Sequence, residues 1–149
     1  MIMKKRSVLV LTILCMLLLS ACGEGMTLQT EAGVKQVLVD RGIFDENNEY
    51  RNTRIAADTY YVLCKNKWSV TFEKYVTVSD CVSEYAMGHL LLDDAVERKE
   101  ANYAILEGKQ GEDTYKLIIR VEDTLLIIAG PDTAKEDLQE LAKDLGYYK

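Results

Sequence analysis

The sequence predicts an α+β fold: a single domain, over residues 28–149, in which an antiparallel sheet of about five strands packs against three helices in the order αββαβββα. Two kinds of periodicity support this class. Apolar residues alternate with polar ones in several short segments, as in half-buried strands, and recur at helical spacing in three longer segments. With a single proline among 149 residues, no repeat and no Gly/Ser-rich stretch, the chain has the size and composition of one domain with one core.

The first predicted helix covers residues 28–41. Its narrow apolar stripe consists of Val34, Val37 and Leu38. Gly42 follows it, where a residue in the left-handed conformation commonly ends a helix, and Ile43 is placed to contact Leu38 as in a Schellman motif. The polar residues 45–50 then predict a loop.

A β-hairpin is predicted next, from residues 59–64 and 68–76, because both segments are rich in aromatic and β-branched residues. A two-residue turn at Asn66-Lys67 would place Leu63 opposite Val70. One apolar face of the hairpin would then carry Tyr61, Leu63, Trp68, Val70 and Phe72.

The second predicted helix begins after Ser79, a plausible N-cap, and runs to about Glu97. Its apolar stripe consists of Val82, Tyr85, Ala86, His89, Leu92 and Val96. Gly88 lies inside this helix at a cost of about 1 kcal/mol relative to alanine, so the helix could bend or stop early.

Three further strands complete the predicted sheet. They cover residues 102–107, 115–121 and 124–129. A turn at Glu122-Asp123 would place Leu126 beside Ile119 and Ile128 beside Leu117, so that the apolar residues of both strands share one face.

The last helix follows Gly130-Pro131, because proline cannot donate to a strand ladder. Thr133 and Glu136 match a capping box at its start. Its buried residues are predicted to be Leu138, Leu141, Ala142 and Leu145. Gly146 followed by Tyr147 predicts the same ending as in the first helix.

The opposite face of the predicted sheet also carries apolar residues. They are Val62, Ile118, Leu125 and Ile127. Either a helix covers this second face, as in a strand buried on both sides, or the face is a docking surface for another chain.

The first 22 residues have the pattern of a targeting segment. Lys4, Lys5 and Arg6 precede an apolar run from Val8 to Leu19, which is too short to span a bilayer. The run ends in the sequence Leu-Ser-Ala-Cys at positions 19–22, which resembles the lipobox of bacterial lipoproteins. An ordinary secretory signal cleaved after residue 21, with Cys22 unmodified, is the alternative.

The lipoprotein resemblance implies that residues 1–21 are a signal peptide and that Cys22 becomes the first, lipid-modified residue. Residues 22–27 would form a short tether. Two or three acyl chains give a stable anchor. The resemblance therefore implies a protein held by Cys22 to the extracytoplasmic face of a cell membrane.

The net charge of the mature chain argues against two classes of binding partner. The full chain has 18 basic and 24 acidic residues. Removal of residues 1–21 takes away three basic residues and no acidic ones, and it leaves 128 residues with a net charge of −9. Nucleic-acid binding requires Lys and Arg to neutralise phosphates, so the composition argues against a nucleic-acid partner. The same charge argues against electrostatic attraction to anionic lipids.

The sequence offers few groups for catalysis. His89 is the only histidine and lies on an apolar stripe, which favours a histidine at the edge of the core that is hydrogen-bonded to backbone. Asp93, Asp94 and Glu97 form a carboxylate cluster, typical of a charged helix surface and otherwise able to supply an acid and a base. No nucleophile elbow, phosphate-binding loop, dinucleotide motif or metal-ligand motif is present, so the sequence predicts neither a metal site nor a cofactor.

Cys64 and Cys81 are the remaining thiols of the mature domain. Outside the cytoplasm a disulfide between them could persist and would contribute about 3 kcal/mol. Two buried free thiols, or a redox role, are the alternatives.

These observations predict a non-enzymatic binding or adaptor module for a protein or an envelope ligand. The alternative is a carboxylate-dependent hydrolase of cell-envelope polymers that uses Asp93, Asp94 or Glu97, and a thiol-based function is a third possibility. Tyrosine is enriched at interfaces. Five tyrosines find no place in the predicted core: Tyr50, Tyr60, Tyr75, Tyr147 and Tyr148.

Overall fold

The computed structural model describes residues 26–100 and 102–148, so the predicted signal peptide and Cys22 lie outside the described residues. The strands are β1 (Glu49–Thr53), β2 (Ala57–Leu63), β3 (Ser69–Tyr75), β4 (Asp93–Lys99), β5 (Tyr103–Gln110), β6 (Thr114–Val121) and β7 (Thr124–Pro131). The α-helices in this part of the chain are α2 (Glu31–Asp40), α3 (Val78–Met87) and α4 (Lys135–Asp144).

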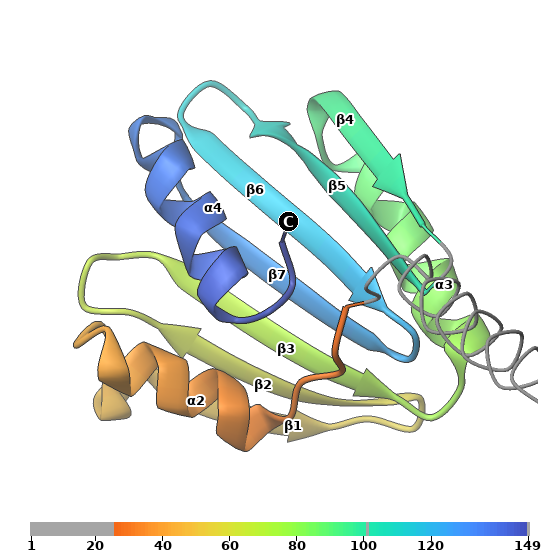
Figure 1. The fold of residues 1–149 in the computed structure, drawn as a ribbon, viewed down its shortest axis with the longest axis horizontal. Coiled ribbons are helices and arrows are strands. Elements are labelled where there is room, and N and C mark those ends of the chain that lie inside the picture. Colours follow the sequence, from red (N-terminus) through yellow and green to blue (C-terminus); the bar gives the residue numbers. More distant parts are fainter. Residues whose placement is uncertain (1–25, 101, 149) are drawn as a thin grey trace, which may run out of the picture.

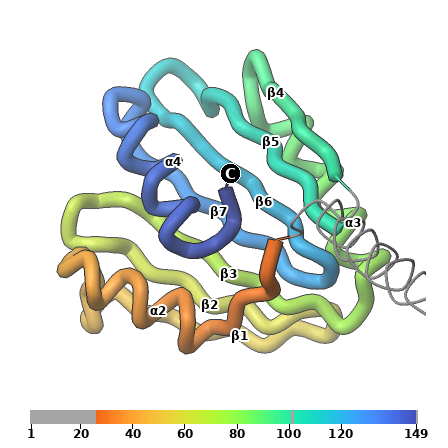
Figure 2. Tube along the Cα trace, in the orientation of Figure 1, coloured from red at the N-terminus to blue at the C-terminus, as the bar shows by residue number. Residues whose placement is uncertain are grey.

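All seven strands form one antiparallel sheet in the order β1-β2-β3-β7-β6-β5-β4. Helices α2 and α4 lie on one face of this sheet and α3 lies on the other (Figure 1; Figure 2 shows the same arrangement along the Cα trace). The α+β class, the antiparallel sheet and the three helices are confirmed. The predicted strand number is corrected from about five to seven, and the element order becomes αβββαββββα.

The two additional strands are the edges of the sheet. Strand β1 begins in the segment that was predicted to be a polar loop. Its polar side chains do not indicate a strand, and it forms one because it pairs with β2. Strand β4 takes residues assigned to the second helix, because that helix ends at Met87. A Cβ at Gly88 would lie 2.8 Å from Ile118 Cδ1, so glycine allows the end of α3 to approach the sheet closely. The N-cap is Thr77 rather than Ser79.

The register of the β2–β3 hairpin differs from the prediction by one residue. Val62 pairs with Val70, because the connection is a three-residue loop in which Lys67 is left-handed with φ of 65°. Cys64 N donates to Trp68 O at 2.7 Å and closes this loop. A shift of one residue exchanges the two faces of a strand. Val62 therefore lies in the core under α2 and α4, and Leu63 lies on the second face.

The C-terminal half follows the prediction closely. Leu117 pairs with Ile128 and Ile119 pairs with Leu126. Helix α2 ends in a Schellman motif at Gly42, and α4 ends in the same way. The predicted capping box is wrong, because a 3₁₀ turn precedes α4 and its N-cap, Ala134, makes no side-chain hydrogen bond.

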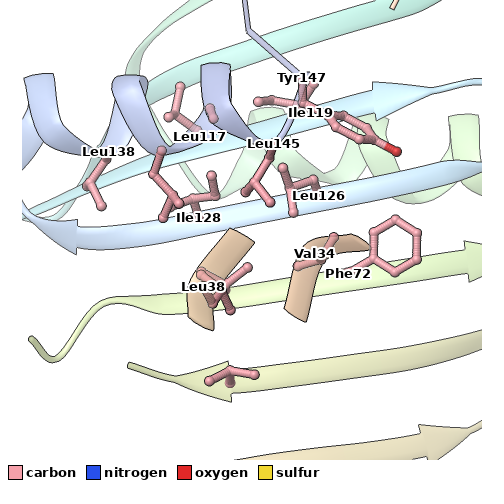
Figure 3. Packing of buried hydrophobic residues seen from close by; sticks show 14 of the residues in the cluster. Val34, Leu38, Phe72, Leu117, Ile119, Leu126, Ile128, Leu138, Leu145 and Tyr147 are labelled. Carbon is pink, nitrogen blue, oxygen red and sulfur yellow. The ribbon is translucent and has the colours of Figure 1, made fainter. Parts of the chain in front are cut away.

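Two cores result, one on each face of the sheet. The larger core lies between the sheet and helices α2 and α4, where side chains of both helices meet those of β3, β6 and β7 (Figure 3). The smaller core lies under α3. Its buried members are Ala57, Tyr75, Cys81, Tyr85, Leu92, Ala104, Leu106, Ile118 and Leu125. Because α3 has only ten residues, it covers only part of the second face.

Candidate binding surface

The uncovered part of the second sheet face is the candidate site. We call it the open sheet face. It consists of Tyr50, Tyr61, Leu63, Ser69, Thr71, Lys116, Ile127 and Ala129. These residues come from five neighbouring strands, and they share one side of the sheet because paired residues of antiparallel strands point in the same direction.

Two rows of side chains cross this surface. One row runs from β5 to β1 through Leu106, Ile118, Ile127, Thr71, Tyr61 and Tyr50, and the next runs through Gly108, Lys116, Ala129, Ser69 and Leu63. Helix α3 buries the β5 end of the first row, at Leu106 and Ile118. The first row therefore passes from a covered apolar core to an open surface that carries Thr71 and two tyrosines.

Aromatic and aliphatic side chains are exposed on this surface. Tyr50 is 60% exposed and Leu63 is 36% exposed. The rings of Tyr50 and Tyr61 have centroids 6.0 Å apart with an angle of 40° between their planes. Contact of this kind between aromatic side chains on a sheet stabilises their positions, so the two rings form a preorganised platform.

A shallow groove of about 470 Å³ runs along one end of the open sheet face. Tyr61, Leu63, Ser69 and Ala129 contribute to it from β2, β3 and β7. The groove is also lined by Lys67 from the β2–β3 loop and by Asp113, Thr114, Gly130 and Pro131. The groove offers an apolar floor with polar groups at its margin.

Lys116 is the charged group of this surface. It is half-buried, and burial lowers the pKa of its ammonium group. Among the described residues, no carboxylate lies within ion-pair distance of it. Buried charges are usually paired, so Lys116 is suited to receive an acidic group. Sequence reasoning missed Lys116, although its place between Tyr115 and Leu117 predicts the face it occupies.

The predicted carboxylate cluster does not form one site. Glu97 Oε1 accepts hydrogen bonds from the Tyr85 hydroxyl at 3.1 Å and lies 3.0 Å from Lys99 Nζ. His89 Nε2 lies 3.1 Å from the same oxygen. His89 is exposed, so the expectation of a histidine bonded to backbone at the core edge is corrected. Burial raises the pKa of Glu97, but the hydrogen bonds from Lys99, His89 and Tyr85 outweigh burial and leave the pKa below its ordinary value.

Asp93 and Asp94 line a separate small pocket of about 180 Å³. The pocket also contains Glu107, whose Oε2 accepts hydrogen bonds from Tyr115, from Gln139 Nε2 at 3.0 Å and from the Tyr148 hydroxyl at 3.1 Å. Burial raises the pKa of Glu107, but these hydrogen bonds outweigh burial and leave it below its ordinary value. Gln139 belongs to α4 and Tyr148 to the segment after it, so Glu107 forms a polar latch that ties both to the sheet.

Most of the five tyrosines that had no place in the predicted core are buried. Tyr60, Tyr75 and Tyr147 belong to the two cores, and Tyr148 is half-buried beside Glu107. Only Tyr50 is largely exposed. Hydrogen bonds inside the fold accompany the burial of three of the others: Tyr75 donates to Glu73 Oε2, Tyr147 shares a hydrogen bond of 2.7 Å with the Thr124 hydroxyl, and Tyr148 donates to Glu107 Oε2. The buried Tyr60 hydroxyl has no such partner among the described residues.

Cys64 and Cys81 are free thiols in this structure. Cys64 belongs to the core under α2 and α4, whereas Cys81 belongs to the core under α3. Of the alternatives that the sequence left open, this arrangement corresponds to two buried free thiols, because the sheet separates the two side chains. Burial raises the pKa of Cys64 to about 11 and that of Cys81 to about 12, which suppresses the reactive thiolate form.

The thiols are expected to react only after unfolding. Treatment of the folded protein with iodoacetamide at pH 8 should leave Cys64 and Cys81 unmodified, and the same treatment in urea should modify both. Mass spectrometry of the two cysteine peptides measures this directly. Recovery of a peptide that links Cys64 to Cys81 would contradict the separation of the two thiols by the sheet.

Residues 26–100 and 102–148 contain no helix with the length and apolar character needed to cross a bilayer. In the same residues, no group of three or more His, Cys, Asp or Glu side chains is arranged to hold a metal ion.

The comparisons with known proteins assign no family to the chain. No family model matches the sequence, and no curated protein matches it significantly. Among solved structures, the chain is similar to a GTP-binding regulator from Thermotoga maritima, with a TM-score of 0.46 and 8% sequence identity over 81% of this chain and 90% of the other. A likeness at this level indicates neither a shared family nor a shared activity.

Proposed function

We propose that the protein is a lipid-anchored, extracytoplasmic binding module that docks a protein partner on its open sheet face. The observation that carries this proposal is the half-buried Lys116, which has no acidic partner among the described residues and stands in a row with the exposed Leu63. The partner would present an apolar surface with an acidic side chain opposite Lys116.

The composition of the surface supports a protein partner. Tyrosine and leucine side chains on a rigid sheet lose little conformational freedom on binding, and tyrosine is enriched among the residues that dominate binding energy. An acidic side chain brought to Lys116 would form a charge-assisted hydrogen bond in a partly desolvated site, where such bonds are strong. The aliphatic and aromatic groups would supply affinity, and Lys116 would supply orientation.

The proposed location rests on residues 19–22, which resemble a lipobox. Lipid on Cys22 would hold the domain at the extracytoplasmic face of a cell membrane, where a partner in the same membrane meets it at high effective concentration. A modest intrinsic affinity would then be sufficient for function.

Photo-cross-linking tests the proposed docking site. A benzophenone side chain at position 50, in the lipidated protein in its native membrane, should capture one dominant protein that mass spectrometry identifies. Leu63→Asp and Lys116→Glu should each reduce the yield about tenfold or more, as expected when a central contact of an interface is lost.

Two controls make this experiment specific. Val39→Asp introduces the same charge at an exposed apolar residue of α2, on the other side of the molecule, and should leave the yield unchanged. Cys22→Ser should mislocalise the protein and abolish capture. Equal yields from Leu63→Asp and the parent protein would rule out the open sheet face as the docking site.

A further inference from the structure

Three exposed aliphatic residues lie together at one end of the sheet. We call them the aliphatic rim: Ile55, Val76 and Val78. Ile55 is fully exposed, Val76 is 73% exposed and Val78 is 49% exposed. Val76 N donates to Ala56 O at 3.0 Å, so the turn that carries Ile55 is next to the segment after β3. Turns normally carry glycine, asparagine, aspartate or serine, so an isoleucine at the tip of a turn is unusual.

The rim lies at the same end of the sheet as the beginning of the described chain. The register pairs Thr53 with Asp58 and Lys74 with Thr124, which brings the β1–β2 and β6–β7 turns to one end. Met26 is buried at this end, where its carbonyl accepts a hydrogen bond of 3.1 Å from Asn102 Nδ2. Figure 1 shows residues 26–30 crossing the helical face from this end toward α2.

The distance between this end and the membrane is limited by the proposed anchor. Met26 lies four positions after Cys22, and four residues span at most about 14 Å when fully extended. Met26 is itself fixed in the core. A lipid on Cys22 therefore holds this end of the sheet, and not the opposite end, within reach of the bilayer.

We propose that the aliphatic rim inserts into the interfacial region of the bilayer that carries the lipid anchor. This inference rests on the proposed lipidation of Cys22. Apolar side chains on a convex turn gain free energy when they enter the boundary between headgroups and acyl chains. The rim and the lipid are two attachment points at one end of the domain, so together they restrict its tilt.

The charges around the rim limit how deeply it inserts. Asp58, Asp80 and Glu100 are exposed at this end. Carboxylates do not enter the hydrocarbon region without a large cost, so the contact is confined to the interface. The contact depends on apolar side chains and not on charge. Insertion should therefore persist in uncharged phosphatidylcholine vesicles and at high salt.

This orientation also determines where the proposed docking surface lies relative to the bilayer. Leu63 and the groove beside it lie at the end of β2 opposite the rim, because β2 runs from Ala57 to Leu63. Seven residues of strand span about 20 Å. The rim contact would therefore hold the groove away from the bilayer and open to an extracytoplasmic partner.

An environment-sensitive fluorophore tests the proposal. Ile55→Cys is labelled with a nitrobenzoxadiazole probe in the full lipidated protein, in which Cys64 and Cys81 are buried, and the protein is reconstituted into phosphatidylcholine vesicles. We expect a blue shift and strong quenching by nitroxides on the lipid acyl chains. Leu91→Cys is the matched control, since Leu91 is an exposed leucine close to the start of β4, at the opposite end of the sheet, and should show neither change.

The outcomes separate the two proposals. Protein that cosediments with vesicles and carries a lipidated N-terminal peptide, but shows no quenching at position 55, overturns rim insertion and leaves the anchor intact. Protein that does not cosediment overturns the anchor and the rim insertion together. A blue shift at position 55 without nitroxide quenching assigns the rim to a protein contact and overturns the bilayer contact. Equal quenching at positions 55 and 91 shows an unoriented domain and also contradicts the proposal.

Discussion

Leu126→Ala is expected to lower the free energy of unfolding by about 3 kcal/mol, the middle of the range for buried leucines. Leu126 is fully buried on β7, between Phe72 of β3 and Ile119 of β6. The strands on both sides hold the site open, so the neighbouring side chains cannot collapse into the cavity. Urea unfolding followed by circular dichroism measures the loss.

The matched control is Leu91→Ala. Leu91 is an exposed leucine, and its truncation should change stability by less than about 0.5 kcal/mol. Similar losses in the two variants would contradict the position of Leu126 in the centre of the core. The unfolding slope should be the same in both, because neither substitution alters the surface exposed on unfolding.

Glu107→Gln is expected to cost about 2 kcal/mol at pH 7, since hydrogen bonds to a charged acceptor are stronger than neutral ones. The carboxylate receives three donors on one oxygen, from Tyr115, Gln139 and Tyr148. An amide keeps the shape but turns one acceptor into a donor. The attachment of α4 and the C-terminal segment to the sheet should weaken first, which hydrogen exchange along α4 can measure.

The effect of Glu107 depends on pH in a defined direction. Its pKa in the folded protein lies below the ordinary value of 4.5. A lowered folded-state pKa contributes stability that is present above the unfolded pKa and is lost as the pH falls through the folded pKa. The gap in stability between the parent protein and Glu107→Gln should therefore narrow from pH 7 to pH 3. A gap that stays constant from pH 7 to pH 3 would contradict the ionised latch.

The sequence predicted best where the interactions are local. The strict alternation from Tyr115 to Val121 placed each residue of β6 on its observed face. The endings of α2 and α4 at Gly42 and Gly146 depend on one left-handed residue in each case, with φ of 69° and 73°. A periodic pattern and a glycine after a helix are sufficient for such predictions, because the energies involved are set within a few residues.

The prediction failed where a contact distant in sequence decides the conformation. Residues 93–99 have no strong strand pattern, and they form β4 because β5 offers an edge for pairing. Residues 49–53 become β1 for the same reason on β2. In the β2–β3 hairpin, one left-handed residue at Lys67 lengthened the loop and exchanged the faces of Tyr61 and Leu63.

The candidate site was only partly predictable for this reason. A second apolar sheet face was expected, with a covering helix and a docking surface as alternatives. Helix α3 covers Ile118 and Leu125, and the row beyond Ile127 stays open, so each alternative describes part of the face. The exposed leucine of this surface was assigned to the core, because its face depends on the register of one hairpin.

The sequence by itself determined the α+β class, the C-terminal hairpin, the endings of α2 and α4, and the pattern that predicts a lipid anchor at Cys22. The tertiary structure decided which strands lie at the edges, which face of β2 is buried, and how far α3 reaches across the second face. Periodicity and capping act over a few residues and are encoded locally. Register and coverage depend on free energy gained between segments far apart in the chain, and the open sheet face is the part that those contacts leave uncovered.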